Sequence, residues 1–78
     1  MKPFAIGIQV ENRYVELLVQ EFSLDHELHY QCTVGSSIVF WIERDPKGNW
    51  RQLDGTFNSL TSIIGEKIDQ YKQRQSGN

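Results

Sequence analysis

Residues 37 to 44, Ser-Ile-Val-Phe-Trp-Ile-Glu-Arg, form the stretch that decides the expected fold. This run is rich in β-branched and aromatic side chains, which suit a pleated, packed surface, and it has too few polar positions for an amphipathic helix. We therefore predict an interior strand. Successive side chains point to opposite faces of a sheet, so the strand presents two apolar sets. These are Ile38, Phe40 and Ile42 on one face, and Val39 and Trp41 on the other.

The length and composition of the chain limit its function. A chain of 78 residues forms one small domain, and such a domain buries only about 60% of the surface that its unfolded form exposes. We expect one compact domain over residues 1–74 and a disordered tail at 75–78. An extensive catalytic cleft does not fit this size, so we expect no enzyme and no cofactor. The aromatic content of 12% is typical of a folded domain rather than a disordered chain.

Charge and cysteine content set expectations about partners and location. The net charge of -2 gives no general attraction for nucleic-acid phosphates or anionic membranes. No apolar run approaches the roughly 20 residues of a membrane span. The single cysteine, Cys32, cannot form an internal disulfide, which favours a cytoplasmic protein over a small secreted one.

Two alternating segments near the N-terminus predict a β-hairpin. Apolar residues alternate with small or polar ones from Phe4 to Val10, and the alternation resumes from Val15 to Val19. A two-residue turn at Asn12 and Arg13 would place apolar residues opposite one another. The expected pairs are Val10 with Val15, Ile8 with Leu17, and Ile6 with Val19. The polar stretch from Ser23 to Glu27 is then expected to be a loop.

The third strand, expected from Leu28 to Val34, can pair with residues 37–44 in two registers. A two-residue turn at Gly35 and Ser36 is favoured locally and would put Tyr30 opposite Trp41. A three-residue loop would instead give the pairs Val34 with Ile38, Cys32 with Phe40, and Tyr30 with Ile42. We expect the second register, because burial of a whole face fixes register more strongly than turn preference does.

The segment Asp45-Pro46-Lys47-Gly48 is the clearest turn in the sequence. Asp at the first position, Pro at the second and Gly at the fourth suit a type I turn. This turn is expected to close a hairpin with residues 49–54. The expected neighbours are Arg44 with Trp50, Glu43 with Arg51, and Trp41 with Leu53.

The C-terminal part predicts one amphipathic helix from about Ser59 to Arg74. Its apolar stripe recurs at three- and four-residue spacings and consists of Leu60, Ile63, Ile64, Ile68 and Tyr71. Thr56, Asn58 or Ser59 could cap the helix, and we favour Asn58. Gly65 is expected where the helix approaches another element closely, and Lys67, inside the stripe, is expected to extend its ammonium group outward.

These elements predict an α+β fold, a five-stranded antiparallel β-meander with one C-terminal helix packed across one face. The covered face is expected to carry Phe4, Ile6, Ile8, Val15, Leu17, Val19, Cys32, Phe40 and Ile42. The other face stays open. It is expected to display Leu18, His29, Gln31, Val39, Trp41 and Leu53.

Candidate sites for chemistry are weak in this sequence. His26, His29 and Cys32 are residue types that zinc accepts, yet positions 29 and 32 of a strand point to opposite faces. The same objection applies to Cys32 and His29 as a nucleophile and its base. We expect no metal site and no catalytic residues.

Two binding surfaces remain as hypotheses. The open face offers Trp41, Val39, Leu18 and Leu53, with His29 beside them, and contiguous apolar patches containing Trp often mark association sites. We therefore expect a small non-catalytic module that binds a protein partner or forms a homodimer. The alternative is single-stranded nucleic-acid or small-ligand binding, through the same face or through a basic hairpin with an aromatic residue. That hairpin contains Arg44, Lys47, Trp50 and Arg51.

Overall fold

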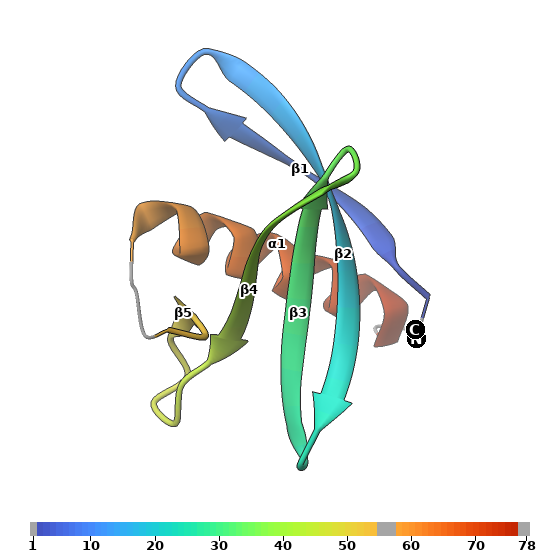
Figure 1. Ribbon diagram of the computed structural model, residues 1–78, viewed down its shortest axis with the longest axis vertical. Coiled ribbons are helices and arrows are strands. Elements are labelled where there is room, and N and C mark those ends of the chain that lie inside the picture. The colour runs from blue at the N-terminus through green and yellow to red at the C-terminus, as the bar shows by residue number, and fades with distance from the viewer. Residues whose placement is uncertain (1, 55–57, 77–78) are drawn as a thin grey trace.

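The computed structural model describes residues 2–54 and 58–76, apart from the side chains of residues 38–40 and 76. It contains five strands followed by one helix (Figure 1). The strands are β1 (Phe4–Val10), β2 (Arg13–Leu24), β3 (Glu27–Val34), β4 (Ser37–Arg44) and β5 (Trp50–Gln52), and the helix is α1 (Ser59–Ser76).

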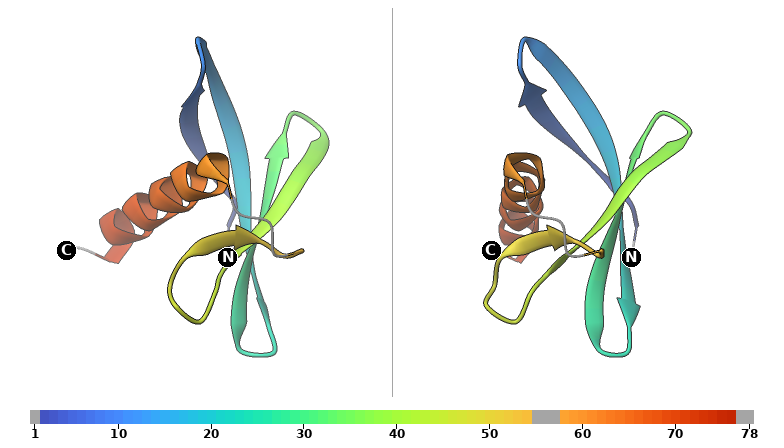
Figure 2. Two further views of the ribbon diagram at one scale, coloured as in Figure 1. Left: turned by 90° about the vertical axis from the view of Figure 1, so that its left-hand side faces the viewer. Right: turned by 60° about the vertical axis from the view of Figure 1, so that its left-hand side comes forward.

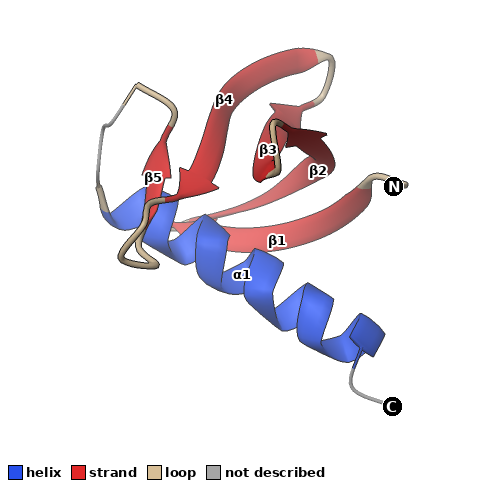
Figure 3. Ribbon diagram, turned by 90° about the horizontal axis from the view of Figure 1, so that it is seen from below, coloured by secondary structure: helices blue, strands red, loops and turns tan. Residues whose placement is uncertain are grey.

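The strands form one antiparallel sheet in the order β1-β2-β3-β4-β5. The sheet is curled, and α1 lies across one side of it, closest to the edge strands β1 and β5 (Figure 3). Meander connections of this kind need only short turns between neighbouring antiparallel strands. The predicted α+β fold is therefore confirmed.

The core lies between α1 and the covered face of the sheet. It consists of Phe4, Ile6, Ile8, Leu17, Val19, Tyr30, Cys32, Ile42 and Trp50 from the strands and Ile64 and Ile68 from the helix. Val15 is half-buried beside this core. The Phe40 side chain, which we also expected here, lies outside the described residues. Alternation along the strands therefore predicted the covered face correctly wherever the structure describes it.

The β1–β2 hairpin turns one residue earlier than predicted. Its turn consists of Glu11 and Asn12, with Glu11 at a φ of 56°, and Val10 pairs with Arg13. The predicted pairs were wrong, since Ile8 pairs with Val15, Ile6 with Leu17 and Phe4 with Val19. A shift of two positions along one strand leaves every side chain on its face. The pattern of covered and exposed side chains therefore could not distinguish the two registers.

The β2–β3 hairpin is longer than predicted, and the loop expected from Ser23 to Glu27 is wrong. Leu24 pairs with Glu27, so only Asp25 and His26 form the turn. Both have positive φ, 52° and 68°. Positive φ at both central residues is the geometry of a type I′ turn, which suits the twist of a hairpin. Asp tolerates this conformation because its short side chain can hydrogen-bond locally.

The β3–β4 hairpin combines the turn of one expected register with most of the pairing of the other, so Tyr30 is not opposite Trp41. A two-residue turn of Gly35 and Ser36 pairs Val34 with Ser37, so the expected pairing of Val34 with Ile38 is wrong. A bulge then shifts the register between Thr33 and Cys32. Beyond it the expected pairs are confirmed, Cys32 with Phe40 and Tyr30 with Ile42. One extra residue in β4 thus reconciles the preferred turn with burial of the apolar face.

The β4–β5 hairpin has the predicted turn and register. Asp45 Oδ1 accepts hydrogen bonds from the backbone N–H groups of Lys47 and Asn49, both at 2.9 Å, and Gly48 has a φ of 90°. These hydrogen bonds, that from Asn49 first, lower the pKa of Asp45. Arg44 pairs with Trp50 and Glu43 with Arg51. The Leu53 N–H donates to the Trp41 carbonyl at 3.1 Å, which places these residues side by side.

The helix begins as predicted at an Asn58 cap. Asn58 Oδ1 accepts from the Thr61 N–H at 2.9 Å, and Thr61 Oγ1 accepts from the Asn58 N–H at 3.2 Å, a reciprocal capping arrangement. Thr56 lies outside the described residues. The helix continues through Ser76, beyond the expected end at Arg74. No helix among the described residues has the length and apolarity needed to cross a membrane.

Candidate functional site

The side of the sheet that faces away from α1 is the open face (Figure 2). Alternation along the paired strands brings large apolar and charged side chains together on it. Its described members include Tyr14, Leu18, Phe22, His29, Gln31, Trp41, Glu43, Arg51 and Leu53. The sequence assigned Leu18, His29, Trp41 and Leu53 to this face correctly. The Val39 side chain lies outside the described residues.

An aromatic pair occupies the middle of the open face. The rings of Phe22 and Trp41 lie 5.3 Å apart between centroids, tilted by 43°. Phe22 is 38% exposed, and Leu18 and Leu53 are 48% and 42% exposed. These four residues, Leu18, Phe22, Trp41 and Leu53, are named the open-face cluster. Phe22 was not among the residues predicted for this site, although alternation along β2 places it on the same face as Leu18.

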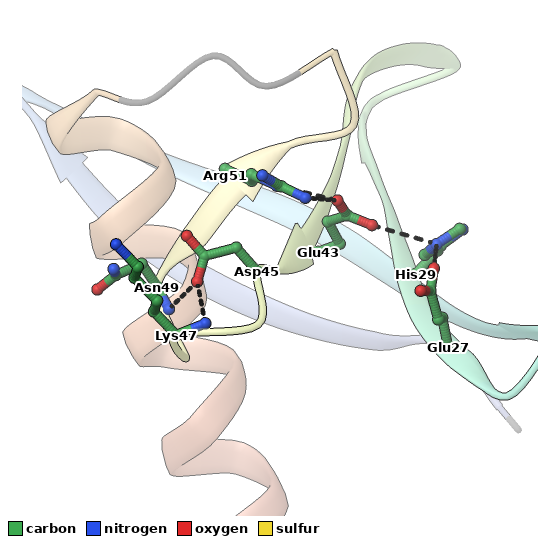
Figure 4. Close-up of polar contacts among 7 residues, drawn as sticks. All are labelled: Glu27, His29, Glu43, Asp45, Lys47, Asn49 and Arg51. Carbon is green, nitrogen blue, oxygen red and sulfur yellow. Dashed lines mark hydrogen bonds and ion pairs between the residues drawn. The ribbon is translucent and has the colours of Figure 1, made fainter.

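A charged row crosses the open face beside this cluster. The row starts next to Phe22 and consists of His29, Glu43 and Arg51, which are neighbours across β3 to β5. Glu43 joins the row: its Oε2 accepts from Arg51 Nε at 3.0 Å, and its Oε1 lies 3.3 Å from His29 Nε2 (Figure 4). The same His29 nitrogen lies 3.5 Å from a Glu27 carboxylate oxygen. Glu43 is thereby held in one orientation between two partners.

Three of these side chains could together hold a cation. One ligand atom each from Glu27, His29 and Glu43 lies within 4.8 Å of the others. Both ring nitrogens of His29 are buried without a hydrogen bond of good geometry. However, Glu27 is 71% exposed, and the Arg51 guanidinium already neutralises Glu43. His29 Nε2 lies beside both carboxylates, so these contacts and the Arg51 pair account for the arrangement without an ion.

The residues considered from the sequence as zinc ligands, or as a nucleophile and its base, do not lie together. His26 lies in the β2–β3 turn, whereas His29 lies on the open face and Cys32 is fully buried on the covered face. Burial raises the pKa of the Cys32 thiol to about 12. A reactive cysteine needs an accessible thiolate, so Cys32 has the environment of a packed core residue.

The basic hairpin does not form a single surface. Arg44 and Trp50 point to the helix side, where the Arg44 guanidinium lies 5.0 Å from the Trp50 ring centroid and pairs with Asp69. Trp50 is buried, and its Nε1 donates to Asp69 at 3.2 Å. Arg51 lies on the open face with Glu43, and Lys47 lies in the turn. Bases could not stack on Trp50 without displacing α1.

A cleft of about 900 Å³ opens between the C-terminal half of α1 and strands β3 to β5. It is named the helix-side cleft and is lined by Tyr30, Arg44, Trp50, Asp69 and Lys72, among others. Its cations are paired: Arg44 with Asp69, and Lys72 with Glu21 and the Tyr30 hydroxyl. The cleft therefore combines aromatic rings with charge pairs that already neutralise each other.

The ion pair at this cleft shifts two pKa values. Burial alone would raise the pKa of Glu21, but hydrogen bonds from Lys72 and Tyr30 lower it below its ordinary value. Burial alone would lower the pKa of Lys72, but its hydrogen bonds to Glu21 and Tyr30 raise it. Both shifts favour the charged forms, as expected for a hydrogen-bonded pair.

The described residues offer three features: an open apolar cluster, a charged row and a cleft of paired charges. Comparison of the chain with protein-family models, with curated proteins and with solved structures finds no match.

Proposed function

We infer that this protein is a small non-catalytic interaction module that self-associates by packing its open face against the open face of a second copy. The observation that carries this proposal is the open-face cluster, in which Phe22 and Trp41 form an aromatic pair on the side that α1 leaves uncovered. Aromatic residues, Trp above all, contribute much of the binding energy at the centres of protein interfaces.

A dimer would cover a modest share of the surface of this chain. A specific interface buries about 800 Å² on each partner, which is about one-seventh of the 5553 Å² surface of this chain. Two sheets of the same twist can pack face to face in either aligned or crossed arrangements. The second copy would give the sheet the apolar layer that it lacks on this side.

The test is association measured by sedimentation equilibrium from micromolar to millimolar concentration. The Trp41→Ser variant should associate at least tenfold more weakly, with little loss of stability, because Trp41 is outside the helix-side core. The matched control is Ile63→Ser, which removes an exposed apolar side chain from α1. A native protein that stays monomeric at millimolar concentration, or that unfolds when Trp41 is replaced, would refute the proposal.

Salt distinguishes this proposal from nucleic-acid binding through the same face. Apolar packing should change little as salt rises, whereas binding to a phosphate backbone weakens steeply. The comparison uses the native chain with an oligothymidylate at low and high salt. Tight binding that disappears at high salt and that is weakened in Trp41→Ser would favour nucleic-acid binding through the open face.

The helix-side cleft supports a second candidate function, the binding of a small planar anion. Aromatic rings and the Arg44 guanidinium line it, and a flat ligand could replace Asp69 beside that cation. Anilinonaphthalene sulfonate is a suitable fluorescent probe. Saturable binding that is lost in Arg44→Met and retained in Trp41→Ser would place a ligand in the cleft, and equal binding by both variants would exclude it.

A further inference from the structure

The outer edge of β1 is open within the described residues, because β1 is the first strand of the sheet and pairs only with β2. Its seven residues, Phe-Ala-Ile-Gly-Ile-Gln-Val, include no charged residue and no proline. Proteins usually protect such edges with charges, prolines, bulges or a very short strand, as β5 with its three residues illustrates. The edge of β1 is therefore able to accept another strand.

The register of the β1–β2 hairpin identifies the backbone groups that face this edge. A two-residue turn makes Val10 and Arg13 the first hydrogen-bonded pair, and alternate residues of β1 then bond to β2. Ala5, Gly7 and Gln9 direct their N–H and C=O groups outward. Ala5 and Gly7 have little or no side chain, so another backbone can approach them closely.

A small groove of about 180 Å³ runs beside this edge, between β1 and α1. β1 and α1 lie next to each other along it (Figure 3). Ala5 and Gly7 form one wall, and Lys67 and Arg74 of α1 belong to the other, with no acidic residue between them. Lys67, which we expected only to extend its ammonium group away from the core, is exposed at this wall.

The two groove cations differ from those of the helix-side cleft. Arg44 and Lys72 are neutralised by Asp69 and Glu21. Within residues 2–54 and 58–76, Lys67 and Arg74 form no ion pair. On a chain with a net charge of -2, this groove is a local basic site beside unpaired backbone groups. An anionic segment in extended conformation would satisfy both features at once.

We propose that the edge of β1 binds an extended acidic peptide segment of a partner protein as a sixth strand of the sheet. Main-chain hydrogen bonds to Ala5, Gly7 and Gln9 supply the affinity, and carboxylates that face Lys67 and Arg74 supply the selectivity. Seven helical residues separate these cations by about 10 Å along α1. Side chains on one face of a strand recur about every 7 Å. The cation spacing is longer than this repeat, and the long, flexible Lys and Arg side chains cover the difference, so a peptide with an acidic residue at every alternate position can present a carboxylate to each cation.

The probe is the blocked peptide acetyl-Glu-Thr-Glu-Val-Glu-Thr-amide, titrated calorimetrically into the full chain at low salt. It should bind, while the same peptide with Gln in place of every Glu should bind more weakly. Lys67→Gln and Arg74→Gln should each lose about two- to fivefold in affinity, the range of exposed ion pairs. Lys47→Gln is the matched control, because it removes an exposed cation from the distant β4–β5 turn and should leave binding unchanged.

Backbone pairing has its own test. Ala5→Pro removes one outward N–H group and no β1–β2 hydrogen bond, so it should preserve the melting temperature and reduce peptide affinity at least tenfold. Should that variant fail to fold, two peptides methylated on alternate backbone nitrogens replace it. One of the two must lose binding to the native chain. Equal binding by both peptides would overturn the proposal, as would a dimer of this chain through β1 that excludes the peptide.

The same titration separates this inference from the open-face proposal. Trp41→Ser alters the open face and should bind the peptide with native affinity. Loss of peptide binding in Trp41→Ser, together with native binding in Lys67→Gln and Arg74→Gln, would assign the peptide to the open face and overturn the edge site.

Discussion

The replacement Gly65→Ala separates helix propensity from packing at one position. In an exposed helix this change stabilises by about 1 kcal/mol. Here a β-carbon on Gly65 would lie 2.0 Å from Cγ of Trp50, far inside contact distance. The indole ring is 8% exposed and is held by Asp69 at its Nε1 and by the Tyr30 ring, 5.4 Å away. It cannot move aside without losing these contacts.

The magnitude follows from these two opposing effects. Overpacking of a core costs about 1 to 3 kcal/mol, and complete loss of a buried Trp costs about 3 to 5 kcal/mol. The severe overlap with Trp50 puts the cost where these two ranges meet, at about 3 kcal/mol, so after subtraction of the propensity gain of about 1 kcal/mol Gly65→Ala should destabilise the fold by about 2 kcal/mol. Urea unfolding measured by far-ultraviolet circular dichroism gives this free energy directly.

Two controls make the prediction specific. A β-carbon on Gly7 would lie 1.8 Å from the Tyr14 hydroxyl oxygen, an overlap as severe as that at Gly65, but Tyr14 is 70% exposed and its ring can swing into water. Gly7→Ala should therefore cost less than about 1 kcal/mol. In a Trp50→Leu background the penalty of Gly65→Ala should largely vanish. A Gly65→Ala protein as stable as the native one would refute the packing of Trp50 on α1.

Two further predictions concern buried and half-buried ionisable groups. Because the folded pKa of Glu21 is lowered, its stabilising effect is present above the ordinary carboxyl pKa and is lost as pH falls through the folded value. Thermal melts of Lys72→Met from neutral to acid pH should show lower stability than the native protein at pH 7 and a smaller further loss on acidification. A pH profile of Lys72→Met parallel to that of the native protein would contradict the pairing. Because burial raises the pKa of Cys32 to about 12, a thiol reagent should label Cys32 only when the fold opens. Gly65→Ala should therefore accelerate labelling about tenfold for each 1.4 kcal/mol of stability lost, and rapid labelling of the native protein would contradict a packed Cys32.

The sequence determined faces far better than registers. Alternation placed Ile8, Leu17 and Ile42 on the covered side because burial of one face penalises any odd shift in pairing. An even shift carries no such penalty, which is why the β1–β2 register was wrong by two positions. The turns were misplaced for a second reason. Glu11 and His26 adopt positive φ although neither is Gly or Asn, the residues that signal this conformation in a sequence.

The open face was predictable in its outline and not in its detail. Trp41 and Leu53 were placed there because the Asp45 turn fixes the β4–β5 register. Phe22 contacts Trp41 across β3, where Phe22 pairs with His29 and Trp41 pairs with Gln31. Glu43, similarly, becomes a partner of both His29 and Arg51 only once three strands are aligned. Contacts across three strands depend on two registers at once.

The basic groove beside β1 could not be predicted from the sequence, for a different reason. Lys67 and Arg74 are seven residues apart on a helix, and that pattern is common to solvated helix faces. Whether these two cations face β1 depends on the angle at which α1 crosses the sheet. Two contacts fix that angle: the Trp50 ring packs against Gly65 towards one end of the helix, and the Phe4 and Tyr71 rings stack at 3.9 Å towards the other. Trp50 is in β5 and Phe4 is in β1, so the two edge strands together orient the helix. The packing that orients the helix thus also places its unpaired cations beside the one long edge that the sheet leaves free among the described residues.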